Sequence, residues 1–240
     1  MAQVGDHRSE FAVGVNGGYV MSTVGFLPKV PQNMHGGMTI GMTLRYTSEK
    51  YFKSICAIVG EVNYTQMGWK ESILTLDDEP VINYQTGLPE EYQRNINYIQ
   101  VPIFARLGWG RERRGLQAFL QAGPQFGFCL GENTEANFDL NNPNLSDRTS
   151  LESSSVEDAS NMYFMPVEKK FDYGIAVGIG TEFSHTKVGH FLVEGRYYYG
   201  LGNIYGSTKR DYFSISNYST FYVKMSYLFD ISKTKNTKIK

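Results

Sequence analysis

The chain has 240 residues, and its 25 Gly, 17 Tyr and 15 Phe within a 41% hydrophobic composition suit one large β domain or two small ones. Its formal net charge of −1 argues against nucleic acid as a partner. No segment approaches the roughly 20 consecutive apolar residues that a transmembrane helix requires. The absence of such a segment does not exclude a transmembrane β-barrel, because only alternate residues of its strands must be apolar.

Eight segments alternate apolar residues with small or polar ones, which is typical of β-strands. They are residues 11–21, 38–46, 55–67, 96–109, 116–130, 171–183, 191–201 and 218–229. The sixth and seventh are the most regular, and they predict a pair of antiparallel strands joined by a short turn. Pro102 cannot donate a ladder hydrogen bond, so we expect a local bulge at this position in the fourth strand.

The connections between these segments alternate between short and long. Residues 47–53, 110–115 and 184–190 form short connections, whereas 22–37, 70–95, 131–170 and 203–217 form long ones. Up-and-down order then places every short turn and both termini at one end, as in bacterial outer-membrane barrels. The sequence therefore predicts an all-β fold: an eight-stranded antiparallel up-and-down transmembrane β-barrel with short periplasmic turns and long extracellular loops.

Charged residues within the strands share one face, and the opposite face carries no charge in the middle of any strand. The charged set comprises Arg45, Glu61, Arg106, Glu182, Glu194, Arg196 and Lys224. A soluble lipocalin-like barrel would have an apolar interior instead, so this pattern favours a barrel with lipid outside. Side chains just fill the interior of such a barrel, and buried charges there must be paired. We predict a lumen salt-bridge network, with a proton or ion pathway as the alternative.

Glycines should make room inside this network. Gly174, Gly178 and Gly180 lie on the inward face of the sixth strand, where we expect them to accommodate Arg196 and Tyr198.

The ends of the chain are expected to lie outside the barrel. Residues 1–10 are polar, so we assume that the signal peptide of an exported protein has been removed. We predict a periplasmic N-terminal tail over residues 1–10, the barrel over 11–230, and a Lys-rich periplasmic C-terminal tail over 231–240.

Residues capable of catalysis or metal binding form no recognisable motif. His7, His35, His185 and His190 lie in tails, loops and turns without metal-ligand spacing, and neither a nucleophile elbow nor a P-loop is present. We therefore expect no enzymatic activity, no metal and no cofactor. An outer-membrane lipid-modifying enzyme that uses His35 and Ser22 at the rim is the alternative. His185 and His190 flank a short connection, which we expect to be an ordinary surface turn, with a joint metal site as the alternative.

The two cysteines should not form a disulfide. Cys56 and Cys129 fall near opposite ends of the predicted barrel. A strand of about ten residues separates such ends by roughly 30 Å, far beyond the Cα separation that a bridge allows. We expect both to be free apolar residues.

Four segments, residues 98–106, 122–127, 172–183 and 194–204, resemble the PorT-like outer-membrane barrels of Bacteroidota, within the wider class of OmpA- and OmpX-like small barrels. The resemblance implies a bacterial outer-membrane location and, for PorT itself, assistance to type IX protein secretion. Outer-membrane barrels usually end on an aromatic residue, whereas Phe229 here is followed by the Lys-rich tail.

Two functions follow from this arrangement. In the first, the barrel is a non-enzymatic membrane anchor or scaffold whose acidic loop 131–170 contacts a surface polysaccharide or binds another envelope or secretion protein through apolar side chains. The candidate anchors are Phe138, Leu140, Met162, Tyr163, Phe164 and Met165. In the second, a small porin-like barrel transports solutes or ions, but the predicted filled lumen argues against it.

Overall fold

The computed structural model describes residues 6–51, 54–75, 77–111, 115–141, 163–185, 187–206 and 213–232. These residues form nine strands. The strands are β1 (Asp6–Leu27), β2 (Gln32–Asn33), β3 (His35–Tyr51), β4 (Ser54–Ser72), β5 (Glu91–Gly110), β6 (Gly115–Ala136), β7 (Phe171–His185), β8 (Gly189–Gly200) and β9 (Ile215–Ser232). Among the described residues, no helix is long and apolar enough to cross a membrane.

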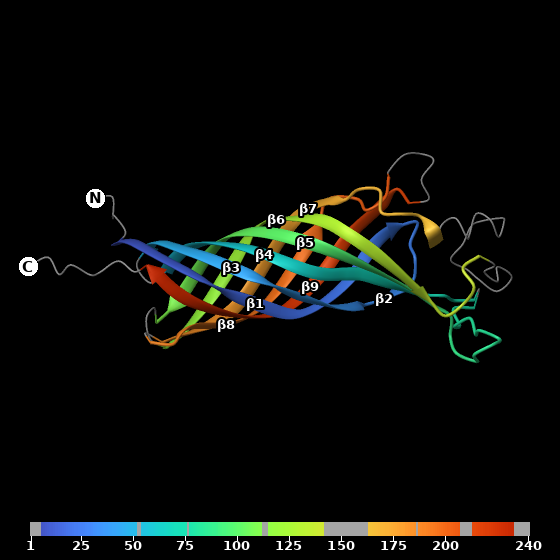
Figure 1. Cartoon of the computed structure of the whole chain (residues 1–240), viewed down its shortest axis with the longest axis horizontal. Helices are drawn as coiled ribbons and strands as arrows, with labels where there is room; N and C mark the ends of the chain where they lie inside the picture. Colours follow the sequence, from blue (N-terminus) through green and yellow to red (C-terminus); the bar gives the residue numbers. More distant parts are fainter. Residues whose placement is uncertain are drawn as a thin grey trace, which may run out of the picture.

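The eight long strands close into a ring (Figure 1). Each pairs antiparallel with its neighbours in sequence, and β9 pairs back onto β1 from Phe11↔Ser232 to Leu27↔Ile215. The short strand β2 pairs only with β4. This topology confirms the predicted up-and-down barrel. The short connections lie at one end with the described ends of β1 and β9, and we call it the short-turn end; the opposite end is the long-loop end.

The strands are longer than predicted, mainly at the long-loop end. β4 continues to Ser72, β5 already begins at Glu91, and β6 runs to Ala136, so residues 131–136 are strand and not loop. The prediction stopped early because the outward residues of these extensions, such as Gln93 and Asn95, are polar and break the apolar alternation. Figure 1 shows the extensions as a projection beyond the middle of the barrel.

The bulge expected at Pro102 is absent, and that prediction was wrong. The pairs Asn63↔Gln100 and Gly60↔Ile103 on either side of Pro102 keep one register between β4 and β5. The missing N–H removes a hydrogen bond without displacing the strand. The register between β5 and β6 shifts instead at Asn97/Tyr98, where Gly131 and Cys129 are the partners and Leu130 is the additional residue.

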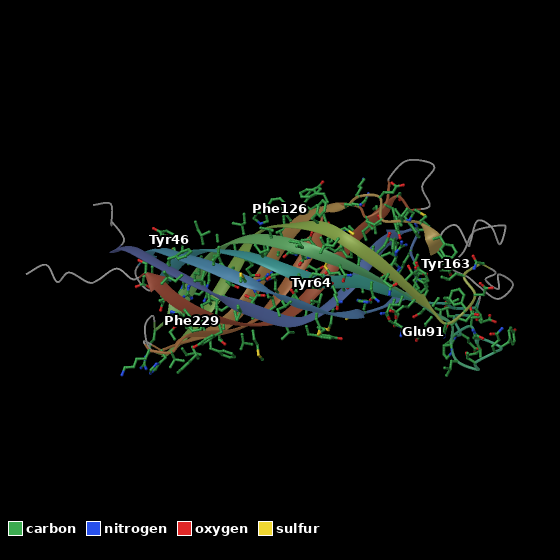
Figure 2. All side chains as sticks on the ribbon, in the orientation of Figure 1. Tyr46, Tyr64, Glu91, Phe126, Tyr163 and Phe229 are labelled. Carbon is green, nitrogen blue, oxygen red and sulfur yellow. The ribbon has the colours of Figure 1, made fainter. Side chains whose placement is uncertain are left out.

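The outer surface carries an apolar band over part of the barrel's length. Exposed aliphatic side chains fill its middle, including Ile58, Ile103, Ile175, Ile179 and Met225. Aromatic side chains border it, with Tyr46 and Phe229 toward the short-turn end and Tyr64 and Phe126 toward the long-loop end (Figure 2). This aromatic-bordered band is the outer surface of a barrel embedded in lipid.

Candidate functional site

The predicted lumen residues form two ion-pair clusters inside the band. In the first, Glu61 on β4 accepts two hydrogen bonds from Arg196 on β8, at 2.8 and 2.9 Å, and pairs with Lys224 on β9 at 2.6 Å. Arg196 also pairs with Glu194 at 2.5 Å, and Gln121 donates a hydrogen bond to Glu194 at 2.8 Å. Four strands, β4, β6, β8 and β9, are therefore tied together across the interior.

The second cluster is built around Glu182 on β7. Both carboxylate oxygens of Glu182 accept hydrogen bonds from Arg45 Nη1 on β3 at 2.8 Å, and Arg106 on β5 binds the same carboxylate. The Arg106 guanidinium also lies 3.7 Å from the ring centroid of Phe119. We call the seven charged residues of the two clusters the ionic layer. They are Arg45, Glu61, Arg106, Glu182, Glu194, Arg196 and Lys224, and all are buried.

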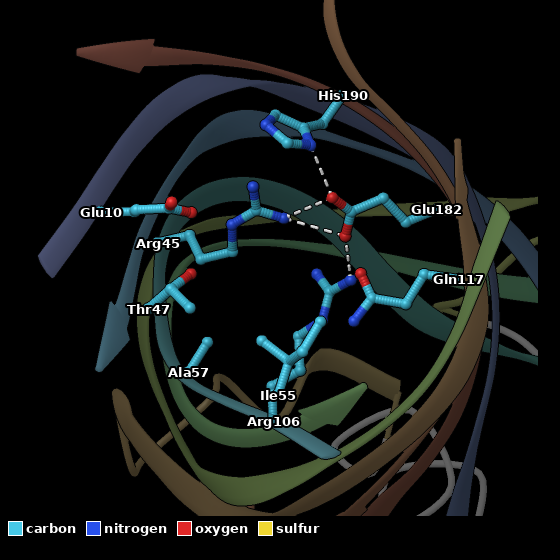
Figure 3. A pocket seen from close by; sticks show the side chains of 9 residues that line it. All are labelled: Glu10, Arg45, Thr47, Ile55, Ala57, Arg106, Gln117, Glu182 and His190. Carbon is cyan, nitrogen blue, oxygen red and sulfur yellow. Dashed lines mark hydrogen bonds and ion pairs between the residues drawn. The ribbon is translucent and has the colours of Figure 1, made fainter. Parts of the chain in front are cut away.

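His190 contacts this layer through Glu182, although the sequence suggested an ordinary surface turn. Only 8% of His190 is exposed, and its Nδ1 lies 2.7 Å from Glu182 (Figure 3). Its Nε2 lies 2.9 Å from Asp230. Both ring nitrogens therefore face carboxylates, which joins β7, β8 and β9 near the turn. The alternation of β8 was the missed signal, because His190 is in phase with the inward residues Leu192 and Glu194.

A small pocket opens beside this cluster at the short-turn end. The ionisable side chains of Glu10, Arg45, Arg106, Glu182 and His190 line it together with Thr47, Ile55, Ala57 and Gln117 (Figure 3). Its volume is about 30 Å³, which is room for about two water molecules. The described part of the chain contains no group of three His, Cys, Asp or Glu side chains placed to hold a metal ion. With a volume of about 30 Å³, the pocket is too small for an organic solute.

Only one of the three inward glycines of β7 makes space for the side chain that the sequence predicted. A Cβ at Gly178 would lie 3.6 Å from the Arg196 Cβ, an ordinary contact distance, so Arg196 does not require this glycine. A Cβ at Gly174 would meet the Tyr198 ring at 2.7 Å, and one at Gly180 would meet the Phe119 ring at 2.6 Å. Gly174 therefore accommodates Tyr198 as expected, whereas Gly180 accommodates Phe119.

The interior changes character at the long-loop end. Buried aromatic side chains pack together there, with ring centroids 5.3 Å apart for Phe26 and Trp69 and 4.4 Å apart for Phe26 and Phe213. We call Phe26, Trp69, Tyr92, Tyr205 and Phe213 the aromatic layer. Apolar residues of the long loops, including Val30, Ile73, Val81, Val167 and Ile204, pack against the same core. The loops thus cover this end of the lumen.

One buried cation lies within the aromatic layer. Arg94 on β5 donates to the Tyr205 hydroxyl at 2.8 Å and pairs with Glu132 on β6 at 2.5 Å. Burial raises the pKa of Tyr92 to about 12, and burial also raises the pKa of Tyr205. Both phenols are therefore neutral hydrogen-bonding groups at neutral pH.

The candidate partner-binding residues divide into covered and exposed groups. Tyr163 is only 2% exposed, because its ring packs on those of Tyr92 and Phe138 at 4.8 and 5.6 Å. Phe138, Leu140 and Met165 are partly buried against the same core. Phe164 is 54% exposed, and Met162 lies outside the described residues.

The other predicted functional groups are engaged in local bonds. Ser22 and His35 are opposite each other in the register of β1 and β3. However, Ser22 Oγ exchanges hydrogen bonds with the backbone of Gly68 at 2.9 Å, and His35 Nε2 bonds to Asn95. They form no catalytic pair in this structure. Cys56 and Cys129 are free, as predicted.

A comparison with protein families identifies the kind of barrel. A family model described as an outer membrane protein beta-barrel domain matches residues 1–206. No curated protein sequence matches the chain.

Several solved structures also match. Ail of Yersinia pestis, in complex with the heparin analogue sucrose octasulfate, is 15% identical over 92% of this chain and 99% of that chain, with a TM-score of 0.36. Neisserial surface protein A is 11% identical over 93% and 100%, with a TM-score of 0.42. OprG of Pseudomonas aeruginosa is 10% identical over 94% and 98%, with a TM-score of 0.43.

Proposed function

The chain belongs to the outer membrane protein β-barrel domain family, and from this premise we propose that it is a non-enzymatic anchor or scaffold that binds a partner at its extracellular end. The protein lies in the bacterial outer membrane, with its short-turn end in the periplasm and its long-loop end outside the cell. The observation that carries the proposal is the filled interior. The ionic layer and the aromatic layer occupy it in series, which leaves the outer surface to perform the function.

The extracellular projection offers apolar side chains to the surroundings. Met34, Tyr84, Leu88 and Phe164 are exposed by 71, 85, 61 and 54%. They belong to three long loops at the end where water surrounds the barrel (Figure 2 labels the neighbouring Glu91 and Tyr163). Exposed apolar groups that lie together in such loops form sites of protein interaction, and our proposal is that these four act in this way. In our proposal Tyr163 and Phe138 hold the longest loop against the barrel, and Phe164 faces the partner.

The residues around Tyr84 and Leu88 also suggest a chemical preference. The described residues of the loop between β4 and β5 include Asp77, Asp78 and Glu79 and no Lys or Arg. An acidic surface with apolar side chains suits a partner whose surface combines basic and apolar residues. The resemblance to PorT-like barrels supports an envelope or secretion protein as that partner, and an accessory role in type IX secretion as the finer proposal.

Photo-cross-linking in native outer membranes tests the proposal. A photoreactive amino acid at Tyr84 or Phe164 should capture one defined envelope protein, whereas the same probe at lipid-facing Ile179 should not capture it. Replacing residues 142–162 by a short Gly/Ser linker keeps Phe138, Tyr163 and Phe164, so the barrel should remain folded and capture at Phe164 should persist. Absence of specific capture from both loop positions, in cells that secrete normally without the protein, would contradict the proposal.

A further inference from the structure

The last residues of β1 have a strand neighbour on one side only. β1 pairs with β9 up to Leu27↔Ile215, but its pairing with β3 ends at Ser22↔His35. The intervening strand β2 pairs with β4 and leaves β1 without a second neighbour. Within the described residues, positions 23–27 of β1 therefore form an open sheet edge. Such an edge presents backbone donors and acceptors to any strand that can reach it.

A cavity of about 740 Å³ lies against this edge. Val24 and Phe26 of β1 form one wall, and Val30 and Pro31 belong to the following loop. Leu74, from the loop after β4, contributes to the lining. The cavity is open to the surroundings, and the charged residues Lys29 and Asp78 also line it. It lies beyond Tyr19, the last outward-facing aromatic residue of β1, and therefore toward the cell exterior.

One side chain already imitates a neighbouring strand at this edge. The Gln32 amide donates to the Val24 carbonyl at 2.7 Å and accepts a hydrogen bond from the Val24 N–H at 3.1 Å. A residue of an antiparallel strand exchanges the same two kinds of hydrogen bond with its partner. The geometry at Val24 thus shows that the edge can be paired from the cavity side.

We propose that this edge and cavity bind an extended polypeptide segment of an extracellular partner, which adds to β1 as a strand and displaces the Gln32 side chain. The inference rests on the proposed scaffold function and names a binding mode for it. A strand can replace the two hydrogen bonds that Gln32 makes with the Val24 backbone, which an acyl chain of a lipid cannot do. Alternate apolar side chains of the segment enter the cavity between Val30 and Leu74.

Two synthetic peptides test the strand addition directly. Amide spectra of the ¹⁵N-labelled barrel in lipid nanodiscs are recorded with Thr-Val-Thr-Val-Thr-Val-Thr and with the same peptide carrying Pro at its centre. The first peptide should shift the Val24 and Phe26 amides while leaving Gly178, deep in the barrel, unchanged. The Pro peptide should bind at least about tenfold more weakly, because Pro removes a donor and disrupts the ladder. Equal binding of the two peptides, or no shift at Val24 and Phe26, overturns the proposal.

A matched pair of variants refines this test. Gln32→Ala removes the competing amide and should tighten binding of the first peptide by roughly fivefold, about the effect of one net hydrogen bond. Asn33→Ala alters the neighbouring residue, whose amide bonds to Ser72, and should leave peptide binding unchanged. Unchanged spectra away from β1 and β2 show that each variant remains folded. Equal affinities for wild type and Gln32→Ala would contradict displacement of Gln32.

Lipid is tested with purified lipopolysaccharide added to the same nanodiscs. If it shifts the Val24 and Phe26 amides and expels the peptide, the cavity is a lipid site and the strand proposal fails. The cross-linking at Tyr84 and Phe164 is independent of this outcome. Capture there without peptide binding refutes strand addition alone, whereas peptide binding without capture refutes the proposed loop-mediated scaffold.

Discussion

The part of the barrel in the membrane band and the extracellular projection are built from the same strands, but they place apolar side chains on opposite faces. Within the membrane band β4 turns Ile58 and Val62 outward and Glu61 inward. Farther along the same strand Trp69 faces inward and Lys70 outward. The first pattern is that of a transmembrane barrel, and the second is that of a soluble one. Each half places apolar side chains on the side away from polar surroundings. The change from lipid to water outside the barrel is therefore visible in the residue pattern of a single strand.

The two interiors are also stabilised by different forces. Lipid outside gives the ionic layer no hydrophobic driving force, and its buried charges are tolerated only because each carboxylate has cationic partners. Water surrounds the projection, so burial of Trp69, Phe26 and Phe213 is favourable there. Mutations in the two layers should consequently destabilise different parts of the molecule.

Loss of a carboxylate from the ionic layer should have the largest effect. Glu182→Ala leaves Arg45 and Arg106 buried without their shared partner, and Glu194→Ala removes one partner of Arg196. We expect losses of up to about 3–5 kcal/mol in the free energy of unfolding, with Glu182→Ala the greater. Urea unfolding of the barrel in lipid vesicles, followed by gel mobility without heating, measures this quantity.

The lipid-facing variant Tyr197→Leu is the matched control. Its side chain lies on the outer surface, where its hydroxyl bonds to Ser219. The loss should be well below that of Glu182→Ala. Equal losses in the free energy of unfolding would mean that the ionic layer contributes no more to stability than a lipid-facing side chain.

A hydroxyl deletion in the aromatic layer should have an intermediate effect confined to the projection. Tyr205→Phe leaves Arg94 Nη1 without its 2.8 Å acceptor while preserving the ring. The expected loss is about 1–3 kcal/mol, the cost of an unsatisfied buried donor. Hydrogen exchange should accelerate at β5 and β6 near Arg94 and Glu132, and remain unchanged around Glu61. The exposed Tyr84→Phe serves as control, and matching exchange changes in both variants would contradict the layered description.

An ion pair on the outer surface of the projection should contribute least to stability. Lys70 Nζ lies 2.7 Å from Glu91, with the two side chains 29 and 50% exposed. Solvent and salt screen such pairs, so Lys70→Ala should cost only about 0–1 kcal/mol. Unfolding measured at low and high salt checks the value. A loss comparable to that of Glu182→Ala would show that exposure does not distinguish the two pairs.

The sequence predicted which residues face lipid and which face the lumen far better than it predicted the contacts between side chains inside the lumen. Alternation was sufficient to assign the inward residues of the membrane band, because a one-residue error would place charges in lipid. It failed near Glu132, since the additional residue Leu130 reverses the phase and turns Glu132 toward Arg94. No sequence pattern marks that bulge. Which carboxylate meets which cation also depends on distances across the lumen, as for Glu61 and Lys224.

The extensions of the strands near Trp69 were missed for a related reason. Expected strands ended at residue 67 and began again at residue 96, where outward residues become polar and the pattern typical of a membrane barrel ends. The inward residues continue as Trp69, Tyr92 and Arg94, which follow the opposite pattern. A sequence search for one pattern therefore reports a loop where the strand continues in a different solvent.

The comparison of the two layers predicts that weakening the aromatic layer alone does not change ion conductance. The wild-type barrel should give no steady current in planar bilayers, because the ionic and aromatic layers obstruct the lumen in series. Trp69→Ala enlarges only the extracellular layer, and Glu61 with Arg196 and Lys224 still fills the lumen below it. This variant should therefore lose stability without gaining current, while an open porin in the same bilayer provides the positive control. Steady conductance of the wild type that scales with salt would support the transporter alternative. Current gained by Trp69→Ala alone would show that the aromatic layer is the single barrier and that the ionic layer is permeable.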